Sequence, residues 1–268
     1  MDLNEVKLHT WEDFEAEITS LLDTVREKRA ETKLHVSRPL FRGHVNASWK
    51  LDTTLGGYTS QQYSMRDYYN LIGGVRPAVV SFTERDWNLS EKYSIDESIP
   101  GPPLGYDFMI YLRHHGFPSP LLDWTRSPYV AAYFAFRTEG AAQNDSVAIY
   151  SYVEYYGHAH MWDLDKAAIF VSGPYVITHK RHYTQQCEYT ICKKRVNDSY
   201  VYANHEDAIV TDNFQGSLRK YVLPGKERAK ALEKLNVMNI SAYSLFGNEE
   251  SLMETLAYQE ITQRQSKA

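Results

Sequence analysis

Three short segments carry residue types that could handle a charged, phosphate-bearing ligand. They are Phe41-Arg42-Gly43, Thr125-Arg126-Ser127 and Gln186-Cys187-Glu188. An arginine offers a planar, permanently charged fork for phosphate oxygens, and a hydroxyl can hydrogen-bond a sugar. A carboxylate stabilises the positive charge that develops on carbon when a glycosidic bond breaks. If the three segments meet in the fold, they could bind a nucleotide and cleave its sugar–base bond.

Each segment needs an element to position it. Residues 39–44 predict a short strand that contains Arg42, and residues 187–192 predict another. On that second strand Gln186 and Glu188, two residues apart, would point the same way. Ser127-Pro128 predicts the start of a helix, because serine is a good N-cap and proline suits the first helical position. We therefore expect the second segment to lie where a strand enters a helix.

The remaining pattern predicts a mixed fold. Further strands are expected at residues 146–153, 171–178, 200–202 and 220–224, and helices at 14–29, 226–235 and 249–259. Residues 61–115 are expected to mix helical stretches with a proline-rich loop at 100–103. Thr10 and Asp13 resemble a capping box before the first helix. Because no repeat, linker or low-complexity stretch interrupts the chain, we predict a single α+β domain over residues 1–268.

Charge and composition limit the function classes. A net charge of −5 argues against a broad electrostatic grip on nucleic-acid backbones. The polar N-terminus lacks a signal-peptide core and no window is apolar enough to span a bilayer, so we expect a cytoplasmic protein with no membrane partner. Cys187 and Cys192 would face opposite sides of a strand, which disfavours a disulfide. Cysteine and histidine spacings do not resemble a zinc site, so no metal is expected.

The chain resembles the FRG-domain family. Phe41-Arg42-Gly43 matches the triplet that gives the family its name, and residues 114–135 resemble its second block, including Leu121-Leu122-Asp123-Trp124-Thr125 and Ser127-Pro128. Similar segments continue at 185–190 and 223–246, so that the resemblance covers about residues 8–258. The chain departs from the family at His44, at Leu55-Gly56-Gly57 and at Cys187-Glu188, and the last departure bears most on function.

The order of the three segments is also similar to that of the Arg-Ser-Glu class of ADP-ribosyltransferases. This resemblance implies an α+β fold with a split, mostly antiparallel sheet and surrounding helices, and NAD as the substrate. It implies that Glu188 supports the oxocarbenium-like transition state, that Gln186 faces the nucleophile, and that Arg42 binds the pyrophosphate or ribose. Five further residues would contact NAD, namely Phe41, Gly43, Thr125, Ser127 and Tyr133.

Other interpretations remain open for the same residues. Arg42 could staple the fold by binding Asp123, and Ser127 could be only a helix cap. Glu188 could be solvated on a strand edge, and Tyr133 could belong to the core. A non-catalytic module would use the Arg42 pocket to bind a nucleotide or a partner protein. A nuclease would place histidines at phosphate; the candidates are His44, His114, His115 and the cluster at residues 179–182.

The acceptor is not fixed by the sequence. Basic groups at residues 179–182 and 193–195 flank Glu188. Tyr183, Tyr189, Tyr200 and Tyr202 could stack on unpaired bases. We therefore favour a nucleic-acid acceptor, RNA above all, over a protein acceptor. The behaviour of the family suggests a toxin of a toxin–antitoxin or anti-phage defence system, which would need an antitoxin protein as partner.

Overall fold

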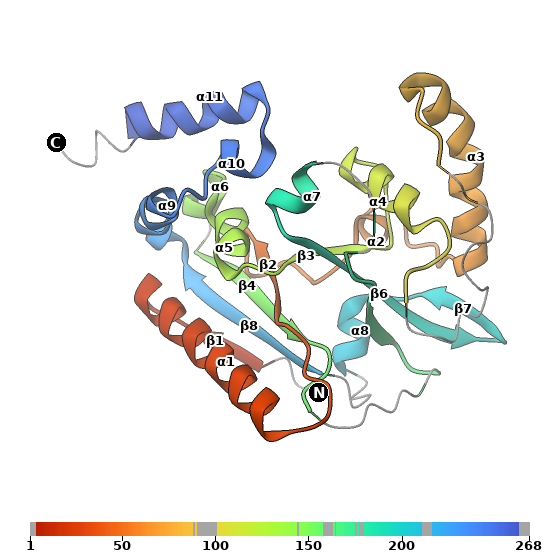
Figure 1. The fold of residues 1–268 in the computed structure, drawn as a ribbon, viewed down its shortest axis with the longest axis horizontal. Helices are drawn as coiled ribbons and strands as arrows, with labels where there is room; N and C mark the ends of the chain where they lie inside the picture. The colour runs from red at the N-terminus through yellow and green to blue at the C-terminus, as the bar shows by residue number, and fades with distance from the viewer. Residues whose placement is uncertain are drawn as a thin grey trace.

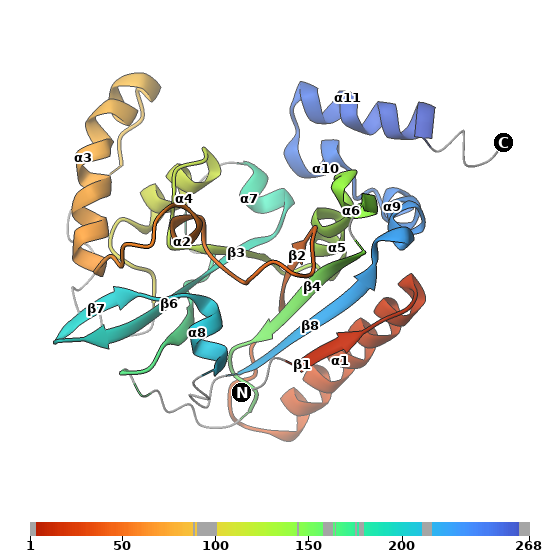
Figure 2. The same ribbon diagram turned by 180° about the vertical axis from the view of Figure 1, so that it is seen from behind.

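The computed structural model has an open, eight-stranded sheet with helices packed around it (Figures 1 and 2). It describes residues 4–87, 89, 101–143, 145–157, 163, 165–174, 176, 180–210 and 216–262. All strand pairs are antiparallel except β1–β8, so the predicted α+β class is confirmed. The strands follow the order β1 (Asn4–Lys7), β8 (Ser217–Pro224), β4 (Ser146–Val153), β2 (Leu40–His44), β3 (Leu122–Thr125), β6 (Cys187–Val196) and β5 (Ala168–Val171), while β7 (Ser199–Tyr202) also pairs with β6.

The strands β2 and β3 are joined by the shortest pairing in the sheet, a single residue pair between Phe41 and Thr125. By contrast, β4 pairs with β8 over its whole length, from Ser146 to Val153. The result is two half-sheets, β1-β8-β4-β2 and β3-β6-β5-β7, joined at a seam. Because Phe41 and Thr125 face each other, side chains on the same side of both half-sheets approach one another across the seam.

Three helices cover one face of the first half-sheet: α1 (Trp11–Glu31), α5 (Pro128–Phe136) and α9 (Arg228–Val237). The predicted capping box begins α1, since the Thr10 hydroxyl accepts from the Asp13 amide and the Asp13 carboxylate accepts from Thr10. Large apolar side chains of these helices pack onto the strands, which removes them from water and stabilises this half.

A second pair of helices covers the same face of the other half-sheet. These are α3 (Met65–Thr83) and α4 (Tyr106–His114), which pack on alternate residues of β6 such as Tyr189 and Ile191. The opposite face of the whole sheet buries Leu40, Trp124 and Tyr150 beneath the short helix α8 (His205–Val210). The two helix groups therefore lie on either side of the seam on one face of the sheet. In Figure 1, α5 borders one side of the seam and α4 borders the other.

Several predicted elements need correction or extension. The strand expected at 171–178 lies at Ala168–Val171, and residues 175 and 177–179 lie outside the described chain. The strand expected at 187–192 begins at Cys187 as predicted and runs on to Val196, so Gln186 lies outside it. The elements not anticipated are β1, α2 (Thr54–Tyr58), α6 (Gly140–Gln143), α7 (Lys180–Thr184), α8 and α10 (Ala242–Phe246). The last predicted helix is α11 (Glu249–Ala257), followed by a π-helical turn over Tyr258–Thr262.

Across the described part of the chain, none of the helices combines the length and apolar character needed to cross a bilayer.

Candidate functional site

A cavity of about 310 Å³ opens at the seam between the two half-sheets. This volume is at the lower end of the range of small-molecule sites, about 300–1,000 Å³, and suits one nucleoside half of a dinucleotide. Strands β2, β3 and the start of β6 supply its floor, and the helices α4 and α5 supply its walls. The lining residues are Phe41, Arg42, Gly43, His114, Asp123, Trp124, Thr125, Ala131, Phe134, Gln185 and Cys187.

Arg42 bridges the seam with its side chain. Its Nη1 donates to the backbone carbonyl of Asp123 at 2.8 Å, and its Nε lies 3.1 Å from Nε2 of His44. Burial lowers the pKa of Arg42 to about 10, although Asp123 acts in the opposite direction. Among the described residues, no carboxylate forms an ion pair with Arg42. The Arg42 guanidinium therefore borders the cavity without a direct ion pair among the described residues, and such a group can bind an anionic ligand.

The carboxylate in the cavity wall belongs to Asp123. Arg113, whose side chain is 8% exposed, pairs with it through Nε and also donates to the Thr54 hydroxyl at 2.8 Å. Burial alone would raise the pKa of Asp123, but the neighbouring Arg113 and Arg42 hold it below its ordinary value. The ion-pair partner of Asp123 is thus Arg113, not Arg42. Arg42 contacts the backbone of Asp123, so it also ties β2 to β3.

Glu188 lies close to this cavity in the sheet but does not line it. Its register partner on β3 is Trp124, so Trp124 stands between Glu188 and the neighbouring strand β2 that carries Arg42. Two strand spacings separate Arg42 and Glu188, about 10 Å. Glu188 is buried, which contradicts a solvated strand edge, and Arg126 holds its Oε1 at 2.6 Å through Nε. The two predicted residues therefore share a region of the sheet but not the described cavity.

Gln185, rather than Gln186, faces the cavity. Gln186 is exposed and sits in a turn with φ of 51°, where its carbonyl accepts from the Arg126 amide at 3.1 Å. Because this turn precedes β6, strand alternation does not align Gln186 with Glu188 as we expected. Gln185 is buried, lines the cavity and donates to the Leu245 carbonyl at 3.1 Å. Gln185 and Gln186 are adjacent in the sequence, and the conformation of the turn directs Gln185, not Gln186, toward the cavity.

The two predicted hydroxyls have different positions. Thr125 lines the cavity, donates to the Gln185 carbonyl at 2.7 Å and accepts from the Ser127 amide at 3.1 Å. Ser127 is the N-cap of α5, and its hydroxyl accepts from the Val130 amide at 3.2 Å. The helix-cap interpretation of Ser127 is confirmed, and only Thr125 of the two is among the residues that line the cavity.

Two residues predicted to contact NAD also have roles in packing and hydrogen bonding. Tyr133 is buried on another side of α5, where its hydroxyl donates to Glu254 at 3.2 Å, and its neighbour Phe134 lines the cavity instead. A Cβ on Gly43 would lie 2.0 Å from the Ala131 carbonyl oxygen. Gly43 is therefore required for the close packing of α5 on β2, although the residue also borders the cavity.

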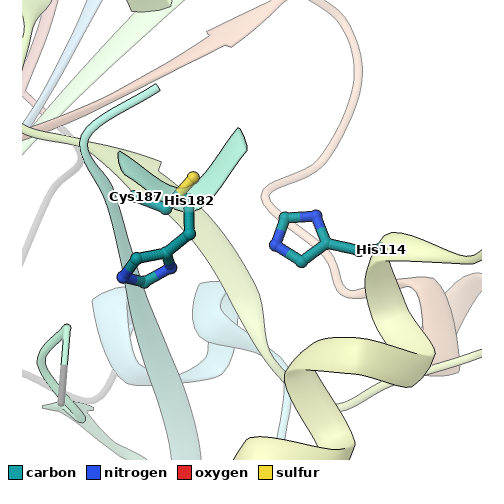
Figure 3. Close-up of side chains that lie close together, drawn as sticks. All are labelled: His114, His182 and Cys187. Carbon is teal, nitrogen blue, oxygen red and sulfur yellow. The ribbon is translucent and has the colours of Figure 1, made fainter. Parts of the chain in front are cut away.

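A polar cluster that the sequence did not reveal lies beside the cavity (Figure 3). The ring of His114, from the end of α4, reaches toward His182 of α7 and Cys187 at the start of β6. The hydroxyl of Tyr189 lies 2.8 Å from His114 Nε2 and 3.3 Å from His182 Nδ1. Burial raises the pKa of the Cys187 thiol to about 12, so an unassisted Cys187 is not a ready nucleophile.

The histidines proposed for a nuclease do not gather at one point. His44 contacts Arg42, and burial lowers the pKa of His44 to about 3, so its ring is neutral. His115 is exposed and lies against Tyr111, and His179 lies outside the described residues. In the described chain, His114 and His182 come together, whereas His44 and His115 have other neighbours.

The fold and the site together define the class of this protein. It is an α+β domain with a cavity at a seam in its sheet, and an arginine lines that cavity. Residues 37–144 match the FRG domain. The chain therefore contains an FRG domain, whose matched span includes β2, β3 and α5 with Arg42, Asp123 and Thr125. The strand β6 with Glu188 lies outside that span. No curated protein and no solved structure matches the chain.

Proposed function

We propose that this FRG-domain chain is an NAD-dependent ADP-ribosyltransferase that uses the seam cavity for part of NAD. The observation that carries the proposal is Arg42, a half-buried cation with no ion-pair partner among the described residues, at the edge of a cavity of nucleoside size. The strands that bear Arg42, Thr125 and Glu188 are also adjacent, in the order β2-β3-β6. This is the order expected for an Arg-Ser-Glu site.

In the proposed reaction the bond between nicotinamide nitrogen and C1′ of its ribose breaks, and nicotinamide leaves with the electron pair. A nucleophile of the acceptor then bonds to C1′ and loses its proton. Arg42 binds the pyrophosphate or ribose, and the Thr125 hydroxyl orients the ribose. Glu188 is the proposed carboxylate that stabilises the oxocarbenium-like transition state. Asp123 is the alternative candidate for this role, because it lines the cavity and Arg113 keeps it ionised.

The experiment incubates the purified chain with labelled NAD and cell extract, followed by nuclease or protease digestion. We expect label that is lost with nuclease, because we favour an RNA acceptor; loss with protease identifies a protein acceptor. Absence of transferred label and of released nicotinamide would remove the enzymatic proposal. Arg42→Lys, which keeps the charge but loses the fork, should raise KM for NAD by about tenfold.

A pair of variants assigns the carboxylate. Glu188→Gln should cost at least ~100-fold in rate if Glu188 stabilises the transition state. Asp123→Asn should lower the stability but leave the rate of the folded protein within a few-fold. The reverse result would move the role to Asp123. Glu154→Gln and Glu206→Gln are matched controls, since neither residue lines the cavity.

A second candidate function is a non-catalytic module that binds a nucleotide or a partner protein through the Arg42 cavity. It is favoured by one observation: Glu188 is absent from the cavity lining and is paired with Arg126. This module would bind NAD or a related nucleotide without consuming it, and Glu188→Gln would bind as well as the parent chain. Calorimetric titration combined with assay of released nicotinamide separates the two functions.

We further propose that the enzyme acts as a toxin in a toxin–antitoxin or anti-phage defence system and is held silent by an antitoxin protein. The expected result is growth arrest when the chain is expressed, with relief by Glu188→Gln. Arrest that persists in a variant without transferase activity would contradict this role.

A further inference from the structure

The cluster beside the cavity brings together three side chains that are good ligands for a transition metal. One ring nitrogen of His114, one of His182 and the sulfur of Cys187 all lie within 4.8 Å of one another. They come from three elements, the end of α4, the short helix α7 and the start of β6, so that the fold rather than a sequence motif assembles them. Figure 3 shows the His114 ring across from His182 and Cys187, which lie side by side.

The surroundings match those of a metal ligand set. The ring of His182 stacks on Tyr189, with an interplanar angle of 17°, and also hydrogen-bonds the backbone of Pro174. A histidine that ligates a metal commonly donates its second ring nitrogen to such a carbonyl, which fixes the ring. Cys187 and His114 also line the seam cavity, so an ion at this position is reachable from it.

Two imidazoles and a thiol favour zinc, which is bound by nitrogen and sulfur in a tetrahedral geometry. With bonds of about 2.0–2.3 Å, tetrahedral ligand atoms lie about 3.3–3.7 Å apart. Separations of up to 4.8 Å therefore have to shorten by about 1.5 Å at most. Rotation of the half-buried rings of His114 and His182 supplies that movement.

We propose that His114, His182 and Cys187 bind one zinc ion, with the fourth coordination position open to an oxygen ligand at the cavity wall. Three protein ligands and one open position are the arrangement of reactive rather than purely structural zinc sites. This inference does not rest on the transferase activity, because it follows from the ligand atoms alone. Without a metal, the Tyr189 hydroxyl hydrogen-bonds the two histidines, and this is the competing arrangement that the test must exclude.

The test uses the full chain after removal of metal with a chelator. Zinc chloride is titrated by calorimetry, and thermal unfolding is followed with and without zinc. Cobalt(II) serves as a spectroscopic probe, because a cysteine ligand gives a thiolate-to-cobalt charge-transfer band. We expect one equivalent of zinc per chain, a rise in Tm on zinc addition, and a charge-transfer band with cobalt.

Matched variants identify the ligands. Cys187→Ser should abolish the charge-transfer band, and His114→Gln or His182→Gln should weaken zinc binding at least ~10-fold. Cys192→Ser and His115→Gln are the controls, since Cys192 faces the other side of β6 and His115 is the exposed neighbour of His114. His182 is only half-buried, so His182→Gln should fold even if Cys187→Ser does not. No stoichiometric binding by the parent chain, or undiminished binding by His182→Gln, would overturn the proposal.

Discussion

The packing of α5 on β2 gives a prediction whose size follows from the structure. In Gly43→Ala the new Cβ would lie 2.0 Å from the carbonyl oxygen of Ala131 and 2.7 Å from the amide nitrogen of Ala135. Both atoms belong to the helix backbone, so no side-chain rotation relieves the clash. Restoring an ordinary contact of about 3.5 Å requires α5 to retreat by about 1.5 Å. Overpacking of this kind costs about 1–3 kcal/mol, and we expect about 3 kcal/mol because backbone must move.

The assay is urea unfolding and calorimetry of the chain without any ligand. A loss of about 3 kcal/mol should lower Tm by about 6–12 °C for a protein of this size. Gly74→Ala is the matched control: nothing lies within 4 Å of its added Cβ, and it is exposed in helix α3. That change should stabilise by about 0.5–1 kcal/mol, because glycine disfavours a helix interior. If Gly43→Ala were as stable as the parent chain, the glycine would not serve helix packing.

Three further predictions concern buried charge. Asp123→Asn should cost about 2 kcal/mol at neutral pH, because it strips Arg113 of its partner. The pKa of Asp123 is lowered in the folded chain, so this cost should be fully present above the unfolded pKa of about 4 and should decline as the pH falls below it, through the folded pKa. A pH-independent cost would refute this. Burial raises the pKa of Glu154 to about 7. The free energy of unfolding of the parent chain should therefore fall by about 3 kcal/mol as the pH rises from about 4.5 to about 7. The urea midpoint of Glu154→Gln should not change over this pH range. A double-mutant cycle of Arg126→Ala and Glu188→Gln should give a coupling of about 1–2 kcal/mol, and additive effects would exclude their ion pair.

Much of the fold followed from local pattern. The helix α1 has a clear cap and apolar spacing, and the strand β4 is mostly apolar because both of its faces are buried. The sequence pattern did not predict the elements that form only because of tertiary contacts. The strand β1 is four residues of mixed polarity and exists because it pairs with β8, more than 200 positions away in the chain. The short helix α7 has no buried residue that would mark it in the sequence.

The candidate site was predictable in its segments but not in the direction of its side chains. Strand order brings Arg42, Thr125 and Glu188 onto neighbouring strands, as their order in the chain suggested. Alternation along each strand then sends Glu188 to the face of Trp124, while Thr125 faces the opposite side. The left-handed conformation of Gln186 places that residue in a turn before β6, so strand alternation does not align it with Glu188, and the sequence pattern does not reveal this turn.

The single register pair between Phe41 and Thr125 makes the seam the place where this sheet bends most easily. On the cavity face each half carries its own helices and apolar core, so the halves form two plates there, whereas the core of the opposite face is shared by both. A molecule held by Arg42 from one plate and Thr125 from the other would clamp them together. Occupancy should therefore slow hydrogen exchange along β2 and β3 more than along β8, and uniform slowing would argue against such a hinge.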